Sequence, residues 1–425
     1  MDMLLSVIII NYNVKYFLEQ CLYSVEKAMG IGVDPGKEAG NPVGNNLNGV
    51  GISGLGEILV VDNHSSDGSV EYLRDRFPGV QFIVNEENTG FSRANNQAVE
   101  KARGKYILFL NPDTIIPEDS LSVCISFLES TPGAGAIGVR MIDGSGCFLK
   151  ESRRGFPTPW VAFCKMTGLT ALFPRSEWLA KYYLGHLPEQ ETHAAPVLSG
   201  AFFMAGREVL EKTGGFDEQF FMYAEDIDLS YRIERAGYTN YYIAETTILH
   251  FKGESTRKDA RYVKLFYKAM SQFRRKHFKG VLSGFFNGLL ELAIWVRAGL
   301  SAFLRLFRKE MSGKGFSGNG AGYRTEVTGD PEEAEKVKTL LMSSGGRVIV
   351  SGRRVLMGEE GGVKATVSEG ANEIIFCEGR IYSFRDIIDS LQKTPGRIPC
   401  KIHALGSFSV VGSHSKDGKG DTIVL

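Results

Sequence analysis

The first 110 residues of the chain alternate between short strand-like runs and amphipathic segments, and this alternation limits the possible folds more than any other feature. β-Branched and aromatic residues dominate four runs, at residues 6–10, 57–62, 80–85 and 106–110. Segments with helical periodicity lie between or beside these runs, at residues 16–29, 69–77 and 92–103. The pattern predicts an α/β fold with a mainly parallel central sheet that carries helices on its faces.

Polar residues stand where the predicted strands end. Asn11, Asp62, Asn85 and Asp113 lie at or just past the carboxyl ends of the four runs. Ligands of open parallel sheets bind at this edge, because loops and helix N-termini face a crevice there. An acid at a buried strand end is costly to desolvate, so we favour a functional role for Asp62 over a turn or capping role.

Composition and charge narrow the classes of partner. Lysine plus arginine and aspartate plus glutamate each number 49 in the 425 residues, so no net charge attracts nucleic acid. The six cysteines occur singly, which favours a reducing cytoplasm and a role as small core residues. The apolar start lacks a basic region and a small-residue cleavage site, so we interpret it as the first buried strand.

Changes in composition divide the chain. We expect a large α/β domain over residues 1–260, with a flexible Gly- and Asn-rich insertion at 30–56. A basic and amphipathic helical segment at 261–310 and a Gly/Ser-rich linker at 311–324 follow, before a small α/β, Rossmann-like domain at 325–425. No complete GxGxxG follows a strand in the last domain, so its role stays open.

Asp113 and His250 are candidates for binding a metal ion. Asp113 lies in the stretch NPDT, and Mg²⁺ or Mn²⁺ takes one or two protein carboxylates beside substrate phosphates. The alternative for Asp113 is a cap for a helix near residues 117–127. His250 follows an apolar strand, where a lone histidine is more often structural than a ligand.

Acids gather in residues 214–238, ahead of a predicted helix that stops at a glycine. The helix dipole and an i,i+4 pair with Arg232 account for Asp228. They do not account for Glu225 and Asp226 together. A second stretch, NTGFSRANN, turns from a glycine-containing loop into a helix, where backbone amides suit phosphate but an ordinary helix start fits equally well.

Six stretches, in order, resemble the inverting family 2 glycosyltransferases, particularly the bacterial rhamnosyltransferase-like branch. They are SVIIINYN (6–13), ILVVDNHSSDGS (58–69), the asparagine-rich stretch at 85–97, FLNPDT (109–114), the stretch at 198–238 and HFKGES (250–255). The resemblance covers about residues 4–260. It implies a GT-A nucleotide-diphospho-sugar-binding fold for this part of the chain.

The resemblance also implies roles for individual residues. Asp226 would be the general base, with Glu225 beside it, and Asp113 would be the retained acid of a DXD motif. His250 would complete a site for Mg²⁺ or Mn²⁺. The donor would contact Asn11, Tyr12, Asn13, Asp62, Asn63, Asn88, Gly90, Arg93, Asn111 and Asp113, and the acceptor side would include Ser199, Gly200 and Phe216.

These residue types suit sugar transfer. A sugar hydroxyl is a poor nucleophile near neutral pH, so a positioned carboxylate must take its proton. A metal ion at Asp113 would stabilise charge on the departing nucleoside diphosphate, and a single displacement inverts the anomeric carbon. We expect transfer from a nucleotide-diphospho-sugar to a glycan or polyprenyl-linked glycan, in cell-surface polysaccharide synthesis.

Two other functions compete with this interpretation. A sugar-1-phosphate nucleotidyltransferase should carry a Gly-rich, Arg-containing loop after the first strand, and NYNVKYFLEQ does not provide one. A non-catalytic nucleotide-sugar-binding or scaffold protein is the remaining alternative. The presence of Asp113, Asp226 and His250 argues against it.

Residues 281–307 form a long apolar stretch that charged residues interrupt, so no uncharged run reaches the roughly 18 residues of a membrane span. The apolar residues fall on one side of a helix, and basic residues flank it at 274–279 and 308–309. We expect an interfacial helix that holds the protein on the inner face of the cytoplasmic membrane. Packing of this face against the protein is the alternative.

Overall fold

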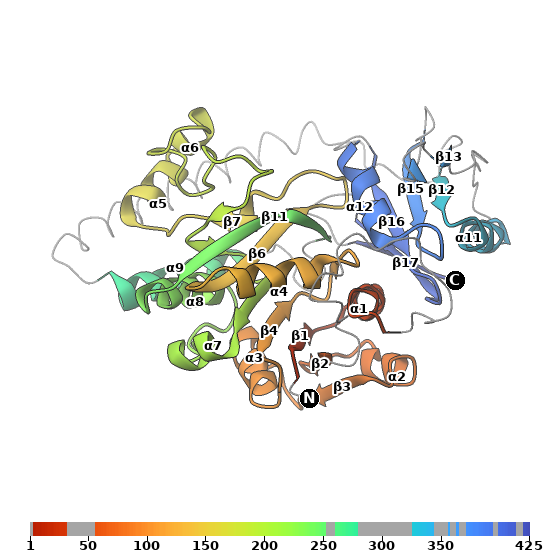
Figure 1. Ribbon diagram of the computed structural model, residues 1–425, viewed down its shortest axis with the longest axis horizontal. Coiled ribbons are helices and arrows are strands. Elements are labelled where there is room, and N and C mark those ends of the chain that lie inside the picture. Colours follow the sequence, from red (N-terminus) through yellow and green to blue (C-terminus); the bar gives the residue numbers. More distant parts are fainter. Residues whose placement is uncertain are drawn as a thin grey trace.

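The computed structural model describes residues 3–31, 56–251, 260–278, 325–343, 356–357, 363–364, 371–393, 398–413 and 420–425. Within them, a nine-stranded sheet forms the centre and helices cover both of its faces (Figure 1). Nearly all of the predicted insertion at 30–56, the apolar segment at 281–307 and the linker at 311–324 lie outside the described residues.

The central sheet is mixed, with most of its strands in two parallel groups. Its order is β3-β2-β1-β4-β10-β6-β11-β5, and β8 also pairs with β11. The strands are β1 (Leu5–Asn11), β2 (Gly56–Asp62), β3 (Val80–Val84), β4 (Tyr106–Leu110), β5 (Thr114–Ile115), β6 (Ala134–Ile142), β8 (His193–Ala194), β10 (Phe202–Gly206) and β11 (Thr239–His250). Strands β1 to β4 are mutually parallel, as are β6 and β11, while β5, β8 and β10 are antiparallel to their neighbours. The α/β fold predicted from the alternating pattern is confirmed.

Two apolar clusters lie on opposite faces of the sheet. The period of two along a strand divides β1 between them: Val7 and Ile9 join one cluster, and Ile8 and Ile10 join the other. The first cluster includes residues from α1 (Lys15–Ala28), α2 (Ser69–Arg74) and α4 (Ser120–Ser130). The second includes residues from α3 (Phe91–Val99), α7 (Arg207–Thr213) and α8 (Glu225–Arg235). This layered packing fixes the carboxyl ends of the strands.

Two peripheral parts complete the large domain. The first is a two-stranded pair, β7 (Arg153–Arg154) with β9 (Val197–Leu198), which follows the 3₁₀ turn η1 (Lys150–Ser152) and connects through α5 (Pro159–Met166) and α6 (Leu169–Leu172). Figure 1 shows α5 and α6 at the end of the molecule away from the C-terminal strands. The second is α9 (Ala260–His277), whose Ala269 and Phe273 pack on Phe220 and Ile227.

The C-terminal part forms its own five-stranded sheet, in the order β12-β15-β16-β17-β18. Its elements are β12 (Thr325–Gly329), α11 (Pro331–Ser343), β13 (Leu356–Met357), β14 (Val363–Lys364), β15 (Glu373–Cys377), α12 (Phe384–Lys393), β16 (Cys400–His403), β17 (Ser409–Gly412) and β18 (Asp421–Val424). Strands β12, β15 and β16 are parallel. We call these residues, from Thr325 onward, the C-terminal lobe.

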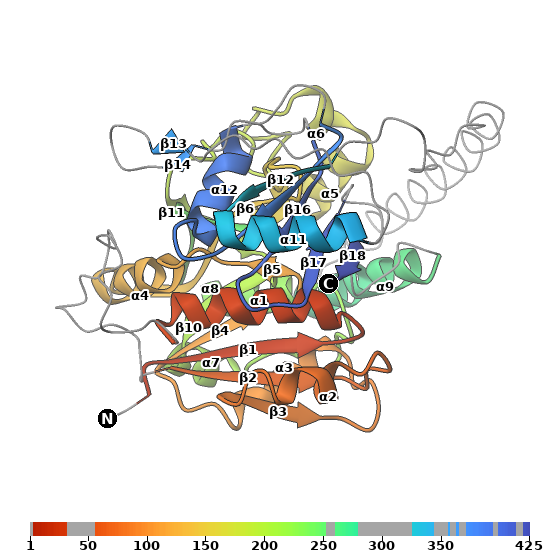
Figure 2. The same cartoon turned by 90° about the vertical axis from the view of Figure 1, so that its right-hand side faces the viewer.

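The C-terminal lobe packs on α1 and on the strand ends beside it. One buried cluster joins Phe17, Ile115 and Phe251 of the large domain to residues of β15, α12 and β16. Phe17 and Phe251 meet edge to face with ring centroids 5.4 Å apart. Figure 2 shows the C-terminal lobe on the side of α1 away from β1 and β2. The lobe therefore supports the segment that connects β4 to β5 and the end of β11.

Polar contacts fix the orientation of the C-terminal lobe. Glu118 accepts hydrogen bonds from the backbone N–H groups of Phe384 (2.9 Å) and Arg385 (3.1 Å), at the start of α12. Lys27 of α1 forms an ion pair with the buried Glu378, which follows β15. The carboxyl edge of this second sheet therefore faces α1, which covers the edge where a Rossmann-like sheet would bind a ligand.

Two further predictions concern the cysteines and a possible membrane-spanning helix. Five of the six cysteines are buried and all are free, which confirms their role as core residues. In the part of the chain that the structure describes, no helix combines the length and the apolar character needed to cross a bilayer.

Candidate active site

Asp62 and Asn11 lie side by side at the carboxyl ends of β2 and β1. The strand register places them opposite each other, and Asn11 Nδ2 donates to Asp62 Oδ1 at 2.7 Å. Asp62 Oδ2 accepts the backbone N–H of Ser65 at 2.9 Å. Each carboxylate oxygen keeps capacity for one further donor. The two residues therefore meet at the carboxyl edge of the sheet, as predicted.

The loop before α3 closes on the same strand end. Asn63 Nδ2 donates to Asn88 Oδ1 (3.0 Å) and to the carbonyl of Gly90 (3.3 Å). Gly90 has φ +85°, and a Cβ added there would lie 2.6 Å from the Phe221 ring. A glycine is therefore required for this loop to approach the turn at residues 220–221. Tyr12, Asn13 and Arg93, also predicted here, are at least partly exposed.

Asp113 and His250 are brought together because the short strand β5 pairs with the end of the long strand β11. Thr114 of β5 pairs with His250 at the end of β11, and the N–H of Phe251 donates to the carbonyl of Asp113 at 3.0 Å. His250 Nε2 then lies 3.3 Å from Asp113 Oδ1 and 3.5 Å from Asn111 Nδ2. Both Asp113 and His250 are buried, with 4% and 7% of their surface exposed.

This pair fits a divalent cation that shares its coordination with a substrate. Among the described residues, the buried His250 Nδ1 has no hydrogen-bond partner, and no three His, Cys, Asp or Glu side chains are grouped to hold a metal ion. A carboxylate oxygen and an imidazole nitrogen suit Mn²⁺, and Mg²⁺ commonly takes few protein carboxylates and fills its shell with phosphate oxygens and water. Two protein ligands are consistent with such a site.

Asp226 is held at the start of α8 by a strained backbone. Tyr223 and Ala224 have φ values of 72° and 65°, left-handed conformations that are costly for residues with a Cβ. Asp226 Oδ1 accepts the N–H of Ile227 at 2.8 Å, and Oδ2 accepts the N–H of Gly200 at 3.3 Å. Strain of this kind concentrates at functional sites, where the surrounding structure fixes a side chain.

Arg154 is a partner of Asp226 that the sequence does not reveal. Its Nη2 donates to Asp226 Oδ2 and to the carbonyl of Leu198 (3.0 Å), and both charged side chains are largely buried. Burial alone would lower the pKa of Arg154, but the charges of Asp226 and Tyr182 outweigh it and raise that pKa. The only signal in the sequence was a pair of adjacent arginines, Arg153 and Arg154.

Glu225, next to Asp226, is buried in an environment that disfavours its charged form. Burial, and then the charge of Asp226, raise the pKa of Glu225 to about 8. Its Oε2 is buried and has no hydrogen-bond partner among the described residues. Glu225 is therefore predominantly neutral at pH 7, whereas Asp226 lies in an ion pair. Glu225 and Asp226, the predicted general base and its neighbour, therefore lie in different environments.

A backbone path connects the two acidic sites. The N–H of Asn111, two residues before Asp113, donates to the carbonyl of Ala201 at 3.0 Å. Ala201 follows Gly200, which donates to Asp226. Gly200, predicted on the acceptor side, thus lies on the path between the two carboxylates, and Ser199 precedes it in the chain.

Phe216 requires a correction to its predicted acceptor-side role. Its ring is 2% exposed and packs on Phe109 at 4.7 Å and on Phe91 at 6.0 Å between centroids. The apolar ring is more stable against these neighbours than in contact with a polar acceptor. Phe216 is a core residue beneath the crevice.

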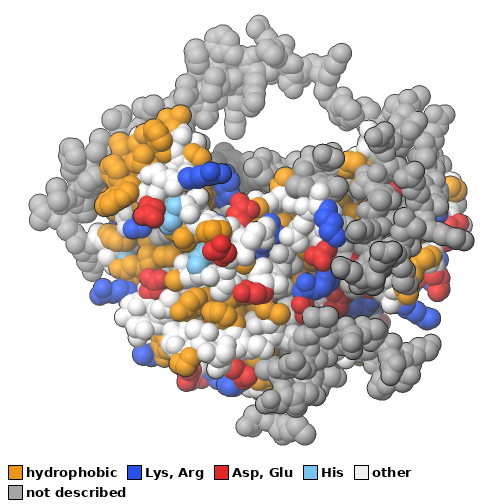
Figure 3. All heavy atoms as spheres, turned by 45° about the horizontal axis from the view of Figure 1, so that its top comes forward, with side chains coloured by type: hydrophobic (Ala, Val, Ile, Leu, Met, Phe, Trp, Pro, Cys, Tyr) orange, Lys and Arg blue, Asp and Glu red, His pale blue; other side chains and the backbone are white. Residues whose placement is uncertain are grey.

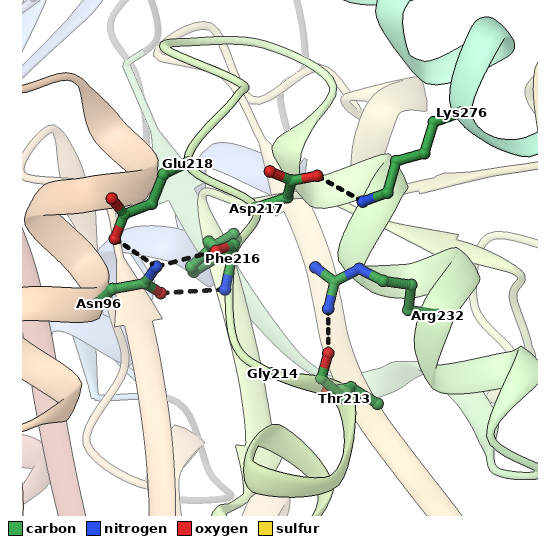
Figure 4. Close-up of a pocket in the computed structure, with 8 residues that line it drawn as sticks. All are labelled: Asn96, Thr213, Gly214, Phe216, Asp217, Glu218, Arg232 and Lys276. Atoms are coloured by element: carbon green, nitrogen blue, oxygen red, sulfur yellow. Dashed lines mark hydrogen bonds and ion pairs between the residues drawn. The ribbon is translucent and has the colours of Figure 1, made fainter.

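A hollow of about 450 Å³ lies away from these carboxylates, between α3, α8 and α9 (Figure 4). Its charged groups are paired: Lys276 with Asp217 at 2.6 Å, and Arg232 with Asp228 at 2.7 Å. The side-chain amide of Asn96 donates to the carbonyl of Phe216 and accepts the backbone N–H of the same residue. The hollow is thus lined by a network that stabilises the fold, and we assign it no ligand.

The same network corrects part of the predicted basic flank at residues 274–279. Lys276 and His277 contact the fully buried Asp228, at 2.8 and 2.6 Å. A buried carboxylate needs charged partners, because its desolvation is otherwise expensive. These two basic residues therefore bind the large domain rather than a lipid surface.

Comparison with known proteins identifies the class of this chain. The family described as Glycosyl transferase family 2 matches residues 6–214. The chain is 29% identical over 216 residues to N-acetylglucosaminyl-diphospho-decaprenol L-rhamnosyltransferase of Mycobacterium tuberculosis, covering 48% of this chain and 68% of that protein. It is 27% identical over 215 residues to rhamnosyltransferase WbbL of Escherichia coli, covering 47% of this chain and 75% of the relative. Residues 6–214 thus belong to glycosyl transferase family 2, and the protein is a glycosyltransferase.

Solved structures resemble this chain more distantly. The mannosyltransferase PcManGT from Pyrobaculum calidifontis, in complex with GDP-Man and Mn²⁺, is 17% identical with a TM-score of 0.42, over 72% of this chain and 80% of that one. TarS of S. aureus is 16% identical with a TM-score of 0.40, over 66% of this chain and 40% of its own. Similarity at this level carries no argument about ligands.

Proposed function

We propose that the protein transfers a sugar from a nucleotide-diphospho-sugar to a hydroxyl of a glycan or lipid-linked glycan, with inversion of the anomeric carbon. The observation that carries this proposal is the short backbone path between Asp113 and Asp226, through Asn111, Ala201 and Gly200. This path connects the proposed donor site and the proposed acceptor site through the backbone of one folded unit.

On the donor side, Asp62 and Asn11 would bind the nucleotide, with the loop from Asn88 to Gly90 closing over it. Asp113 and His250 would hold Mg²⁺ or Mn²⁺ beside the diphosphate. When bound, the ion would neutralise charge on the leaving nucleoside diphosphate.

On the acceptor side, Asp226 would take the proton of the attacking hydroxyl. Its Oδ2 already binds Arg154 and Gly200, whereas Oδ1 has one internal donor, Ile227, so Oδ1 is the oxygen with more capacity for the proton. Arg154 would fix the orientation of this carboxylate. Attack from the face opposite the diphosphate then inverts the anomeric configuration.

We also propose a lipid-linked acceptor in cell-surface glycan synthesis, at the inner face of the cytoplasmic membrane. The names of the two relatives, one for a decaprenol-linked substrate and both for rhamnosyl transfer, support it. The predicted interfacial helix at 281–307 belongs to this proposal and lies outside the described residues.

A turnover assay tests the proposal. The purified protein is incubated with Mn²⁺, a panel of nucleotide sugars that includes an activated rhamnose, and a short-chain polyprenyl-diphospho-sugar. We expect transfer from one donor class, with the opposite anomeric configuration shown by NMR. Donor binding without transfer to any glycan or lipid-linked acceptor would support the non-catalytic alternative.

A further inference from the structure

An apolar surface on α5, α6 and the loop after them is exposed to solvent. It comprises Trp160 (48% exposed), Phe163 (38%), Leu172 (71%), Phe173 (52%) and Trp178 (77%). We call these five residues the α5–α6 apolar surface. Figure 3 shows hydrophobic side chains gathered at the upper left, over the part of the molecule where α5 and α6 lie. Exposed patches of large apolar side chains usually mark an interaction site.

Contacts among these residues make the surface continuous. The rings of Trp160 and Phe163 stack with centroids 5.8 Å apart, and Trp160 Nε1 donates to the carbonyl of Trp178 at 3.2 Å. Thr170 of α6 donates to the carbonyl of Leu179, which ties α6 to the segment that carries Trp178. Two helices and a loop thus present their apolar side chains as one unit.

The charge around this surface is basic, although the whole chain is neutral. Of the charged residues in 150–187, Lys150, Arg175 and Lys181 are exposed, as is the acidic Glu177, whereas Arg153 and Arg154 lie inside the protein. Tryptophan rings at a surface rimmed by lysine and arginine are typical of contact with the headgroup region of an anionic bilayer.

Three side chains, Lys165, Tyr182 and Arg154, connect helix α5 to the proposed base. Lys165 of α5 places its Nζ 3.4 Å from the centroid of the Tyr182 ring. Tyr182 in turn raises the pKa of Arg154, after the larger effects of burial and of Asp226, and Arg154 bonds Asp226. Whatever binds the α5–α6 apolar surface is therefore held close to the acceptor side of the crevice.

We propose that the α5–α6 apolar surface inserts into the headgroup region of an anionic membrane and there presents the acceptor side of the crevice to a lipid-linked glycan. The inference rests on the proposed function for the identity of the acceptor. The α5–α6 apolar surface would be a second membrane contact, separate from the interfacial helix predicted at residues 281–307. The tryptophans would sit at the level of the headgroups, with Arg175 and Lys181 toward the phosphates.

The three tryptophans of the chain allow a direct test, because Trp160 and Trp178 lie on this surface and Trp295 lies in the segment at 281–307. Two variants are compared, Trp295→Phe and Trp160→Phe/Trp178→Phe, on phosphatidylglycerol/phosphatidylcholine vesicles with brominated acyl chains. We expect bromine to quench the fluorescence of Trp295→Phe, which reports only on the α5–α6 apolar surface. Absence of quenching in this variant overturns the inference, whether or not Trp295 is quenched in the other.

Vesicle flotation with a matched control tests the energetic role of the same surface. Leu172→Ser/Trp178→Ser removes the two most exposed of the five side chains, and Ile381→Ser/Met342→Ser removes two exposed residues of the C-terminal lobe. We expect flotation to weaken in the first variant alone, with both variants folded by circular dichroism. Equal flotation of both variants overturns the inference.

Sugar transfer is measured separately, with a short-chain acceptor in detergent-free buffer. If the wild type transfers sugar but its α5–α6 tryptophans are not quenched, the proposed function stands and the inference fails. If they are quenched but no donor supports transfer, the membrane surface stands and the proposed function fails.

Discussion

The two halves of the crevice hold their carboxylates in different ways. On the donor side, Asp113 lies in a short antiparallel pairing of β5 with β11, and the cluster that includes Ile115 and Phe251 fixes it against the C-terminal lobe. On the acceptor side, Asp226 follows two left-handed residues and depends on Arg154, from a peripheral strand.

This difference indicates that the two sides meet different structural requirements. The donor half is supported from behind by a second folded lobe, which suits binding of one kind of ligand in one geometry. The acceptor half connects through Arg154, Tyr182 and Lys165 to helices with an exposed apolar face. Under the proposed function, variation in the acceptor would therefore leave the positions of Asp113 and His250 unchanged.

The largest effect is expected from Asp226→Asn. The amide cannot accept the hydroxyl proton, so turnover should fall by roughly hundredfold or more. Donor affinity, measured by calorimetry with the nucleotide sugar, should stay close to the wild-type value, because the base acts on the acceptor. A turnover near the wild-type rate would remove Asp226 from this role.

The next effect tests whether Arg154 orients Asp226. Arg154→Met removes a hydrogen bond to a charged group, worth about 1.5–3 kcal/mol, so we expect a loss of about 10- to 100-fold in kcat/KM. Arg154→Lys keeps the charge and serves as the control, with a smaller loss and a pH–rate profile close to the wild type. If the methionine variant keeps both its rate and its pH profile, the contact is only structural.

A third change acts on the donor half. Asp113→Ala should weaken donor binding at least about tenfold in Mn²⁺ and have little effect in excess chelator, because the carboxylate acts through the ion. Donor affinity with and without the metal is the measurement. An equal loss in both conditions, or full wild-type activity in chelator, contradicts a metal role for Asp113.

The smallest effect on turnover at pH 7 is expected from Glu225→Gln, since Glu225 is already predominantly neutral there. Its pKa is raised from 4.5 to about 8 in the folded state, first by burial and then by Asp226. The folded state thus holds this proton more tightly, so the stabilisation is complete below about pH 4.5 and is lost as pH rises through about 8.

Unfolding in urea across pH 5 to 9 measures this difference. The free energy of unfolding of the wild type should fall over that range by more than that of Glu225→Gln. Parallel curves for the two proteins would show that Glu225 does not titrate in this way.

The sequence predicted the elements that depend on local pattern. The four strand runs before residue 111 appear as β1 to β4, within a residue or two of their predicted limits. Asn11, Asp62 and Asp113 stand at strand ends in the folded protein because apolar runs and polar stops set strand limits directly. His250 reached Asp113 because the register of β5 and β11 opposes Thr114 and His250.

Only the tertiary structure decided which side chains form ion pairs and which are buried in a core. Arg154 lies 72 positions from Asp226, and Lys276 lies 48 positions from Asp228, so no local period connects them. The neutral state of Glu225 and the buried ring of Phe216 follow from packing around them. Periodicity reports which face of an element is apolar, whereas burial and ion pairing depend on what the rest of the chain places against that face.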